Sequence, residues 1–271
     1  MTDRYAVFGN PVAHSQSPRI HALFAQQSGQ DMRYEAILAP LDGFEQGVRN
    51  FIATGGRGAN VTVPFKEAAF RLATQLTTRA KAAGAVNTLI FAEDAIVGDN
   101  TDGAGLVHDI QINLGFPISR KRVLLLGAGG AARGVVLPLL HEEPGSLVIA
   151  NRSAGKARKL VDSFAAEAHG TMSCSEFSAL AGQSFDLVIN ATSAGLANAE
   201  LPLPEGIFAP GCLAYEMLYG RETAFMRRAA ATDARVADGL GMLVEQAAEA
   251  FYVWRGVRPE TAPVLRELRG A

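Results

Sequence analysis

The chain has 271 residues, of which 48% are hydrophobic, and its formal net charge is −2. This length allows one large α/β domain or two smaller ones, and the composition is that of a folded protein rather than a disordered chain. The near-balanced charge does not indicate a nucleic-acid partner. The sequence contains no apolar stretch long enough to span a membrane and no secretion signal, so we expect a cytoplasmic protein with no membrane partner.

The cysteines and histidines argue against a disulfide framework and against a metal site. Cys174 and Cys212 are the only cysteines, which is too few for a disulfide-rich scaffold or a cysteine-rich zinc site. The five histidines show no metal-binding spacing. We therefore expect a reducing compartment and no metal cofactor.

The first hundred residues alternate between short β-like runs and helix-like runs. Helix starts are indicated by Ser17-Pro18 and by Pro64, because Ser suits an N-cap and Pro suits a first turn. A hairpin is indicated by two β-like runs on either side of Glu93-Asp94. The sequence predicts strands over 5–9, 33–38 and 59–63, helices from 17 to Gly29 and over 44–53, and a hairpin of 86–92 with 95–97.

From about Gly103 the pattern changes to strands and helices in regular alternation. The run 122–126 is apolar enough to be a strand buried on both faces, which is typical of a parallel sheet. Such alternation favours a parallel sheet with right-handed crossovers. The sequence predicts helices over 104–114, to 141 and to 168, strands over 122–126, 147–150 and 185–189, and closing helices over 242–254 and 261–269.

A glycine-rich turn after the strand 122–126 fits the G-x-G-x-x-A pattern of dinucleotide-binding proteins. The turn is Gly127-Ala128-Gly129-Gly130-Ala131-Ala132. Its first glycine allows a tight turn, the second lets the backbone approach a pyrophosphate, and the following helix N-terminus attracts phosphate. The pattern alone is weak, and an ordinary glycine-rich turn is the alternative.

The end of the next strand indicates NADP rather than NAD. An NAD site usually has an acidic residue there, which binds the ribose 2′-hydroxyl. Here the strand is followed by Asn151-Arg152-Ser153 and then by Lys156, and cationic side chains can bind a 2′-phosphate. The alternative is a solvated basic helix start.

Lys66 and Asp102 are the candidate catalytic residues. Lys66 lies in the first turn of a predicted helix, where the helix dipole disfavours an ammonium and could ease proton transfer to or from an alcohol or ketone. Asp102 could pair with it, or could simply cap the helix that follows. Taken alone, Lys66 could equally be a surface charge.

Three further groups of polar residues have two possible interpretations. Ser15 and Ser17 flank a helix start, where one could be the cap and the other a ligand contact. The segment 190–195 follows a buried strand and could line a ligand site or form an ordinary turn. Gln246 lies on an otherwise apolar helix and could be an exposed side chain without a function.

Together these segments resemble the shikimate dehydrogenase family over nearly the whole chain. The order and spacing of the motifs make the resemblance specific. The motifs are GNPVAHSQSP at 9–18, NVTVPFKE at 60–67, AGAVNTL at 83–89, GDNTDG at 98–103, GAGGAARG at 127–134, NRS at 151–153, NATSAG at 190–195, YEMLYG at 215–220 and DGLGMLVEQA at 238–247.

The resemblance implies a two-domain α/β enzyme of aromatic amino acid biosynthesis. A substrate domain with a mixed, mostly parallel sheet would comprise residues 1–103 and 240–271. A Rossmann-type NADP domain would comprise 104–239, with shikimate in a cleft between the domains. The enzyme would reduce 3-dehydroshikimate to shikimate with NADPH, as a monomer or a homodimer.

By motif match, the resemblance also assigns the site residues. Lys66 and Asp102 would be the catalytic pair. The remaining substrate contacts would be Ser15, Ser17, Asn60, Thr62, Asn87, Tyr219 and Gln246. The cofactor contacts would be Gly127, Ala128, Gly129, Gly130, Ala131, Asn151, Arg152, Ser153, Lys156, Thr192, Met217 and Gly239.

Four residues depart from the common family pattern, and two alternative functions stay open. Gln16 replaces a frequent Lys, Thr78 a frequent Glu, Glu216 a frequent Asp and Lys156 a frequent Arg. One alternative is a quinate/shikimate dehydrogenase that also uses NAD, against which Ser17 and Arg152 argue. The other is a non-catalytic NADP-binding regulator.

Overall fold

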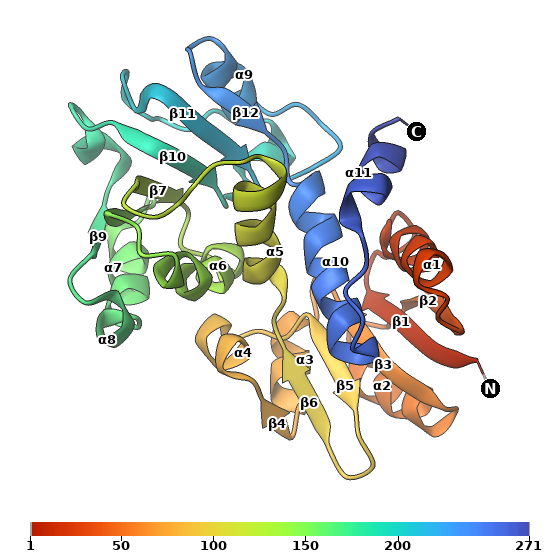
Figure 1. The fold of residues 1–271 in the computed structure, drawn as a ribbon. Coiled ribbons are helices and arrows are strands. Elements are labelled where there is room, and N and C mark those ends of the chain that lie inside the picture. The colour runs from red at the N-terminus through yellow and green to blue at the C-terminus, as the bar shows by residue number, and fades with distance from the viewer. Residues whose placement is uncertain (1, 271) are drawn as a thin grey trace. The chain divides into compact units, whose positions relative to one another are not determined.

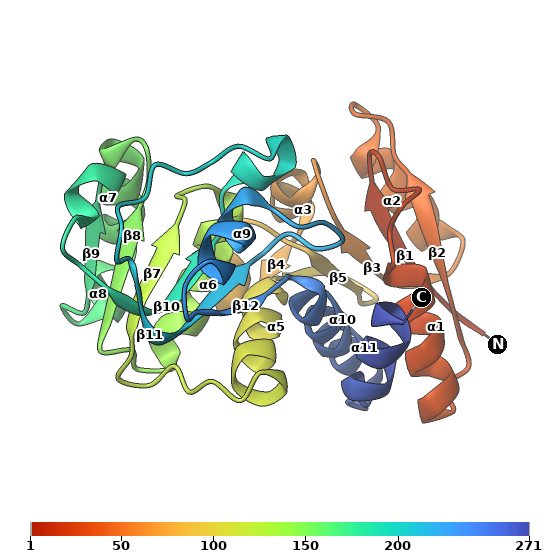
Figure 2. The same ribbon diagram turned by 90° about the horizontal axis from the view of Figure 1, so that it is seen from above.

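The computed structural model describes residues 2–270. The chain forms two compact units: the first contains the residues up to Gly105 and those from Leu243 onward, and the second is Leu106–Met242. Each unit contains a six-stranded sheet, and the elements of both can be followed by their labels in Figures 1 and 2. The predicted α/β class is confirmed.

The first unit has a mixed sheet with the strand order β2-β1-β3-β5-β6-β4. Three neighbouring strand pairs are parallel, and the two pairs that include β5 are antiparallel. The predicted mostly parallel sheet and its hairpin are therefore confirmed. The strands are β1 (Asp3–Gly9), β2 (Met32–Leu38), β3 (Gly56–Val61), β4 (Gln75–Leu76), β5 (Thr88–Phe91) and β6 (Ile96–Asp99).

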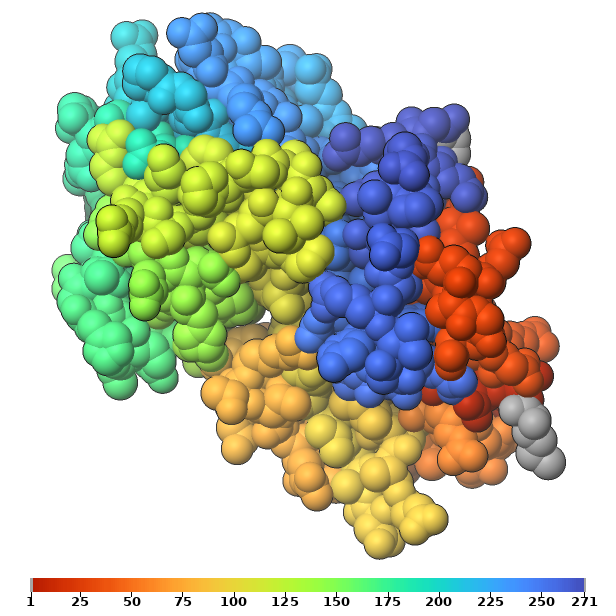
Figure 3. All heavy atoms as spheres, viewed as in Figure 1, coloured from red at the N-terminus to blue at the C-terminus, as the bar shows by residue number. Residues whose placement is uncertain are grey.

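Helices cover both faces of this sheet. Phe8 of β1 packs edge-to-face against Phe44 and Phe51 of α2, whereas the Tyr5 ring lies 4.7 Å from that of Trp254 of α10. Because side chains alternate across a strand, α2 and α10 lie on opposite faces. Figure 3 shows the last helices beside α1 in this unit. The helices are α1 (Ser17–Ser28), α2 (Phe44–Ala53), α3 (Lys66–Leu72), α4 (Thr78–Ala83), α10 (Leu240–Arg255) and α11 (Thr261–Arg269).

The second unit has a fully parallel sheet with the strand order β12-β11-β10-β7-β8-β9. This is the doubly wound order of dinucleotide-binding folds, with the switch point between β7 and β10. The strands are β7 (Arg122–Leu126), β8 (Ser146–Ala150), β9 (Met172–Ser175), β10 (Phe185–Asn190), β11 (Phe208–Glu216) and β12 (Arg235–Ala237). The helices are α6 (Gly130–His141), α7 (Ala154–Asp162), α8 (Ala165–Ala168) and α9 (Ala224–Ala230), and the last residues of α5 (Asp102–His108) also belong to this unit.

Two predicted helices differ from the structure. The helix expected to run to 168 is interrupted, because Phe164 leaves helical geometry and its side chain is buried with 2% exposure. The helix expected over 104–114 already begins at Asp102 as α5, and its last part, Asp109–Asn113, is π-helical. The buried Asp109 carboxylate there accepts a 2.6 Å bond from the Tyr215 hydroxyl.

The division between the units falls inside two helices. We expected it near residue 103 and near residue 240; it lies after Gly105 in α5 and after Met242 in α10. Within residues 2–270, no helix has both the length and the apolar character that a membrane crossing requires.

Candidate active site

Lys66 and Asp102 form an ion pair in the first unit. Lys66 is the first residue of α3, shortly after β3, and Asp102 is the first residue of α5, shortly after β6. The Lys66 Nζ atom donates to Asp102 Oδ2 at 2.5 Å, and the two side chains are 31% and 20% exposed. A proton-transfer group and its counter-ion therefore lie together and stay partly accessible.

Asn87, which precedes β5, fixes the second oxygen of Asp102. Its Nδ2 donates to Asp102 Oδ1 at 2.8 Å, and its Oδ1 accepts the backbone N–H of Thr101 at 2.9 Å. The Asn87 side chain is almost fully buried. The carboxylate of Asp102 is thus held in one orientation, with one oxygen directed to Lys66 and the other to Asn87.

Gln246 of α10 lies next to this group. Its Oε1 is 3.4 Å from Asn87 Nδ2 and 3.5 Å from Thr101 Oγ1, and its Nε2 donates to the Leu243 carbonyl at 2.7 Å. A Cβ at Gly105 would lie 2.6 Å from the Gln246 backbone nitrogen, so the glycine allows α5 to approach α10 closely. Four of the predicted residues, Lys66, Asn87, Asp102 and Gln246, are therefore brought together.

Asn60 and Thr62 come from the end of β3. Asn60 is buried, and its Nδ2 donates to the Asn87 carbonyl and to Thr88 Oγ1, while its Oδ1 accepts the Tyr34 hydroxyl at 2.7 Å. Asn60 therefore has an acceptor lone pair, but no free donor, to offer a ligand. A Cβ at Gly9 would lie 2.5 Å from Thr62 Cγ2, so the side chain of Thr62 occupies space that only a glycine leaves free.

Ser15 and Ser17 lie at the start of α1, but neither of them caps the helix as expected. The helix begins at Ser17, and Gln16 stands at the N-cap position without a side-chain capping bond. The prediction that a serine caps this helix is therefore wrong. Instead, Ser15 Oγ accepts the Ser17 backbone N–H at 3.3 Å, which holds the turn in place.

A partly buried ion network, which the sequence did not predict, lies next to the group. Arg79 of α4 binds both oxygens of Asp99, at 2.7 and 2.6 Å, and Glu249 of α10 at 2.8 Å. Burial opposes the ionisation of Asp99, but the bonds from Arg79 and Thr77 outweigh it and lower the pKa of Asp99. Asp99 leads directly into Asn100, whose Oδ1 accepts the Asp102 backbone N–H at 3.1 Å.

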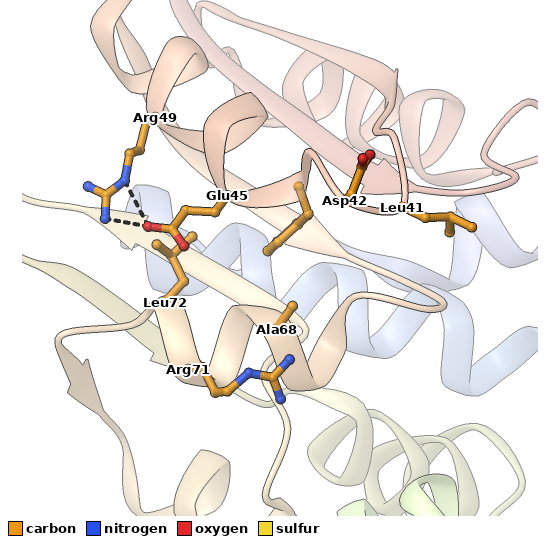
Figure 4. Close-up of a pocket in the computed structure, with 8 residues that line it drawn as sticks. Leu41, Asp42, Glu45, Arg49, Ala68, Arg71 and Leu72 are labelled. Atoms are coloured by element: carbon orange, nitrogen blue, oxygen red, sulfur yellow. Dashed lines mark hydrogen bonds and ion pairs between the residues drawn. The ribbon is translucent and has the colours of Figure 1, made fainter.

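A groove of about 290 Å³ between α2 and α3 does not contain these groups (Figure 4). Its charged side chains have mixed signs, and Glu45 is already bonded to Arg49 at 2.7 Å. The groove is lined by none of the predicted site residues; its walls are Leu41, Asp42, Phe44, Glu45, Arg49, Ala68, Arg71 and Leu72.

The glycine-rich turn of the second unit has the geometry of a phosphate-binding turn. Gly127 directly follows strand β7 and has a φ of 108°, a conformation that favours glycine. Gly129 is the N-cap of α6, and a Cβ on Gly129 or Gly130 would meet no atom within 4 Å. The turn around Ala128 and Ala131 therefore leaves room for a ligand at the helix N-terminus, which fits a pyrophosphate.

The loop after β8 presents cationic side chains. Arg152, Ser153 and Lys156 are exposed, and Asn151 Nδ2 donates to the Ser153 carbonyl at 3.1 Å, which shapes the loop. No acidic side chain follows β8 at the position that would bind a ribose 2′-hydroxyl. The loop therefore fits a 2′-phosphate.

Thr192, Met217 and Gly239 lie at the carboxyl ends of the remaining strands. The Met217 N–H donates to the Asn190 carbonyl at 3.1 Å, and a Cβ at Gly239 would lie 2.2 Å from the Met217 carbonyl oxygen. These segments are thus packed directly on one another. Tyr219 also belongs to the second unit, where its side chain is 39% exposed, and so it is not part of the first-unit group.

No metal site accompanies these groups. Among residues 2–270, no three His, Cys, Asp or Glu side chains are placed to hold a metal ion. The donors of the first-unit group are one amine, one carboxylate, amides and hydroxyls, which suit a polar organic substrate better than a metal.

Three family models match the chain. Residues 7–89 match the shikimate dehydrogenase substrate binding domain, residues 110–199 match shikimate / quinate 5-dehydrogenase, and residues 239–269 match the shikimate 5′-dehydrogenase C-terminal domain.

Individual relatives agree over the full length. A shikimate dehydrogenase (NADP(+)) of Dechloromonas aromatica is 65% identical, covering 99% of this chain and 98% of the relative. The crystal structure of an Ael1 enzyme from Pseudomonas putida is 51% identical with a TM-score of 0.95, covering 98% of each chain. That of shikimate 5-dehydrogenase from Thermus thermophilus in complex with NADP(H) and shikimate is 32% identical with a TM-score of 0.88, covering 99% of each. The chain therefore belongs to the shikimate dehydrogenase family of oxidoreductases.

Proposed function

We propose that the chain catalyses the reversible, NADPH-dependent reduction of 3-dehydroshikimate to shikimate in aromatic amino acid biosynthesis. The observation that carries the proposal is the ion pair between Lys66 and Asp102, whose atoms lie 2.5 Å apart. Asn87 holds the second carboxylate oxygen of Asp102 by a hydrogen bond. The relative from Dechloromonas aromatica with 65% identity is an NADP-dependent shikimate dehydrogenase.

The chain's part in the chemistry is proton transfer at Lys66. When bound, NADPH supplies a hydride to the keto carbon of the substrate. Lys66 donates a proton from Nζ to the oxygen of that carbon, and in the reverse direction it accepts one. Asp102 stabilises the ammonium and directs it, because its other oxygen is held by Asn87 and cannot turn away.

Hydroxyl and amide groups bind the rest of the ring acid. Ser15, Ser17 and Thr62 offer hydroxyls, and the amide groups of Asn87 and Gln246 already lie beside Asp102. Tyr219 of the second unit is proposed as a further contact, and Asn60 as an acceptor. A polar, uncharged donor set of this kind suits a polyhydroxylated ring with one carboxylate.

The two units divide the work in this proposal. The substrate domain would be residues 1–103 and 240–271, and the NADP domain residues 104–239. In the NADP domain, the turn from Gly127 to Ala131 would hold the pyrophosphate. Arg152 and Lys156 would hold the 2′-phosphate together with Asn151 and Ser153, while Thr192, Met217 and Gly239 would lie at the nicotinamide half.

Two finer points are part of the same proposal. Cys174 and Cys212 are both free thiols, which fits the reducing cytoplasm. We propose a monomer or a homodimer, since neither the substrate group nor the cofactor turn needs a residue from a second copy. Light scattering of the purified protein measures that state.

A broader quinate/shikimate dehydrogenase is the second candidate. One of the matching family models describes both substrates, which is the observation in its favour. Against NAD use stands the loop after β8, where Arg152 and Lys156 occupy the region in which an NAD site places an acid.

The deciding experiment follows the absorbance of reduced nicotinamide with purified protein. Each of shikimate and quinate is combined with each of NADP and NAD. Rapid reduction of NADP with shikimate alone supports the proposal, whereas comparable rates with quinate or NAD assign the broader activity. A protein that binds NADP but reduces it with neither substrate is a binding protein, and the proposal is then wrong.

A further inference from the structure

Glu216 is a fully buried carboxylate at the end of β11, in the second unit. Its Oε2 accepts bonds from Asn190 Nδ2 at 2.7 Å and from Thr223 Oγ1 at 2.9 Å, and its Oε1 accepts the Leu218 N–H at 3.2 Å. Burial raises the pKa of Glu216 despite these bonds. Burying an acid costs free energy unless hydrogen bonds offset it, and the donors that bond Glu216 are therefore held in place around it.

The neighbour that Glu216 organises is the loop after β10. Because Asn190 Nδ2 faces Glu216, Asn190 Oδ1 is directed to Thr192, where it accepts the backbone N–H at 3.1 Å and the hydroxyl at 2.8 Å. The Thr192 hydroxyl in turn accepts the Ala194 N–H. The orientation of one amide group therefore sets the position of Thr192.

The loop after β10 is in close contact with the glycine-rich turn on one side and with the residues around Glu216 on the other. A Cβ at Gly195 would lie 2.7 Å from Leu218 Cδ1 and 3.0 Å from Thr223 Cγ2, so the loop lies against the residues that bind Glu216. A Cβ at Gly127 would lie 3.1 Å from the Ala191 carbonyl oxygen, so the loop's other side lies against the turn. The loop has no space to shift without moving one of these neighbours.

We propose that Glu216 is a positioning residue for the nicotinamide half of the cofactor, an inference that rests on the proposed function. In a doubly wound sheet, one mononucleotide is bound by each half of the sheet. Arg152 and Lys156 follow β8 in one half, whereas Glu216 and the groups it bonds lie at the ends of β10 and β11 in the other. Glu216 acts through Asn190 on Thr192 and through the backbone on Met217.

The bonding pattern predicts the effect of a neutral isostere. In a Glu216→Gln variant, either amide orientation places an N–H donor against another donor, Asn190 Nδ2 on one side or the Leu218 N–H on the other. Combining Asn190→Asp with Glu216→Gln exchanges both partners and restores one carboxylate facing one amide. The carboxylate introduced at position 190 then accepts from the new amide through one oxygen and from Thr192 through the other.

The test compares the two halves of the cofactor in the full-length wild type, E216Q and the N190D/E216Q double variant. Calorimetry measures the binding of NADP and of adenosine 2′,5′-bisphosphate, which lacks the nicotinamide half, and kinetics gives KM for NADPH and kcat. Losing a bond to a buried charged group predicts an about tenfold weaker binding of NADP, and an equal rise in KM, for E216Q. The binding of adenosine 2′,5′-bisphosphate stays at the wild-type value, and the double variant recovers most of the loss.

Three results would overturn the inference. They are unchanged NADP binding by E216Q, an equal loss for NADP and for adenosine 2′,5′-bisphosphate, and a folded double variant that recovers nothing. If neither variant folds, T223V and T223S decide, because only the serine keeps the hydroxyl bonded to Glu216, and equal NADP binding by both contradicts the inference. A wild type that binds NADP but does not oxidise shikimate refutes the proposed function, and the binding comparison still decides the role of Glu216.

Discussion

The candidate site of the first unit consists of side-chain groups, whereas that of the second unit consists mainly of backbone groups. In the first unit, side chains do the work: Lys66, Asp102, Asn87 and Gln246 are bonded to one another. In the second unit, the glycine-rich turn offers backbone groups and free space, and Gly127 has a φ of 108°. A reacting carbonyl needs a proton donor at a fixed place, whereas a phosphate needs N–H groups that nothing obstructs.

This difference between side-chain and backbone groups predicts which substitutions each site tolerates. A side-chain site fails when an atom is removed, because the partner group is left without its bond. A site made of backbone groups fails when an atom is added. A new Cβ either fills the space that the ligand needs or disfavours the positive φ that the glycine adopts.

The largest effect is expected from Lys66→Met. Removing the amine eliminates the proton donor, and we expect kcat to fall about a thousandfold. NADP binding, measured by calorimetry, stays unchanged because the turn at Gly127 belongs to the other unit. Lys81→Met, which removes an exposed lysine of α4, serves as the matched control and retains full activity. A Lys66→Met enzyme with wild-type kcat contradicts the catalytic assignment.

The second effect concerns the ion network beneath the first-unit site. Arg79→Met leaves the buried Asp99 carboxylate without its cation, whereas Glu249 keeps its ion pair with Arg258, and we expect a loss of about 3 kcal/mol in the free energy of unfolding. Arg49→Met breaks the exposed pair with Glu45 and should cost less than about 0.5 kcal/mol in urea unfolding.

The same network gives a pH dependence with a defined sign. The pKa of Asp99 in the folded protein lies below its ordinary value of 3.8, so the stabilisation is present above pH 3.8 and is lost as the pH falls through the folded-state pKa. The stability difference between wild type and Arg79→Met should therefore narrow in acid. A difference that is constant from neutral pH to below pH 3.8 would show that Asp99 is not the partner that matters.

The secondary structure could be predicted from the sequence where it depends on interactions between residues that are close in the sequence. Four of the five residues in strand Arg122–Leu126 are apolar and buried, and the turn after it is rich in glycine, so both were predicted correctly. Strand β11 was not predicted, since Pro210 and Gly211 interrupt its pattern. Short α4 was also missed, and with it Arg79.

The predicted site depended more on the resemblance than on patterns in the residues. Taken alone, Lys66 and Asp102 are 36 residues apart in the sequence, and only the fold makes them neighbours. The bonds that orient them, from Asn87 and from the network of Arg79, likewise join distant segments. Periodicity reports which face of an element is buried and gives no information about pairs of this kind.

The third effect tests the addition of an atom to the backbone site. Gly127→Ala forces a side chain into a φ of 108° and places its Cβ 3.1 Å from the Ala191 carbonyl oxygen. We expect the turn of the free variant to relax away from this conformation, so that NADP binding has to restore it at a strain of about 2 kcal/mol and becomes more than tenfold weaker in calorimetry. Gly47→Ala in α2 of the first unit is the control, because its added Cβ makes only an ordinary contact, 3.5 Å from Phe8 Cε1, and NADP binding should not change.

The smallest effect is expected where the second unit does use a side chain. Arg152 is exposed, so water and salt weaken its bond to a 2′-phosphate. Arg152→Gln should lower the preference for NADP over NAD by about tenfold, measured as the ratio of kcat/KM values, and less so at high salt. Lys159→Gln removes another exposed cation from α7 and should leave the ratio as it is. If both variants shift the ratio equally, the preference for NADP arises from the general positive charge of this region and not from a fork-shaped bond made by Arg152.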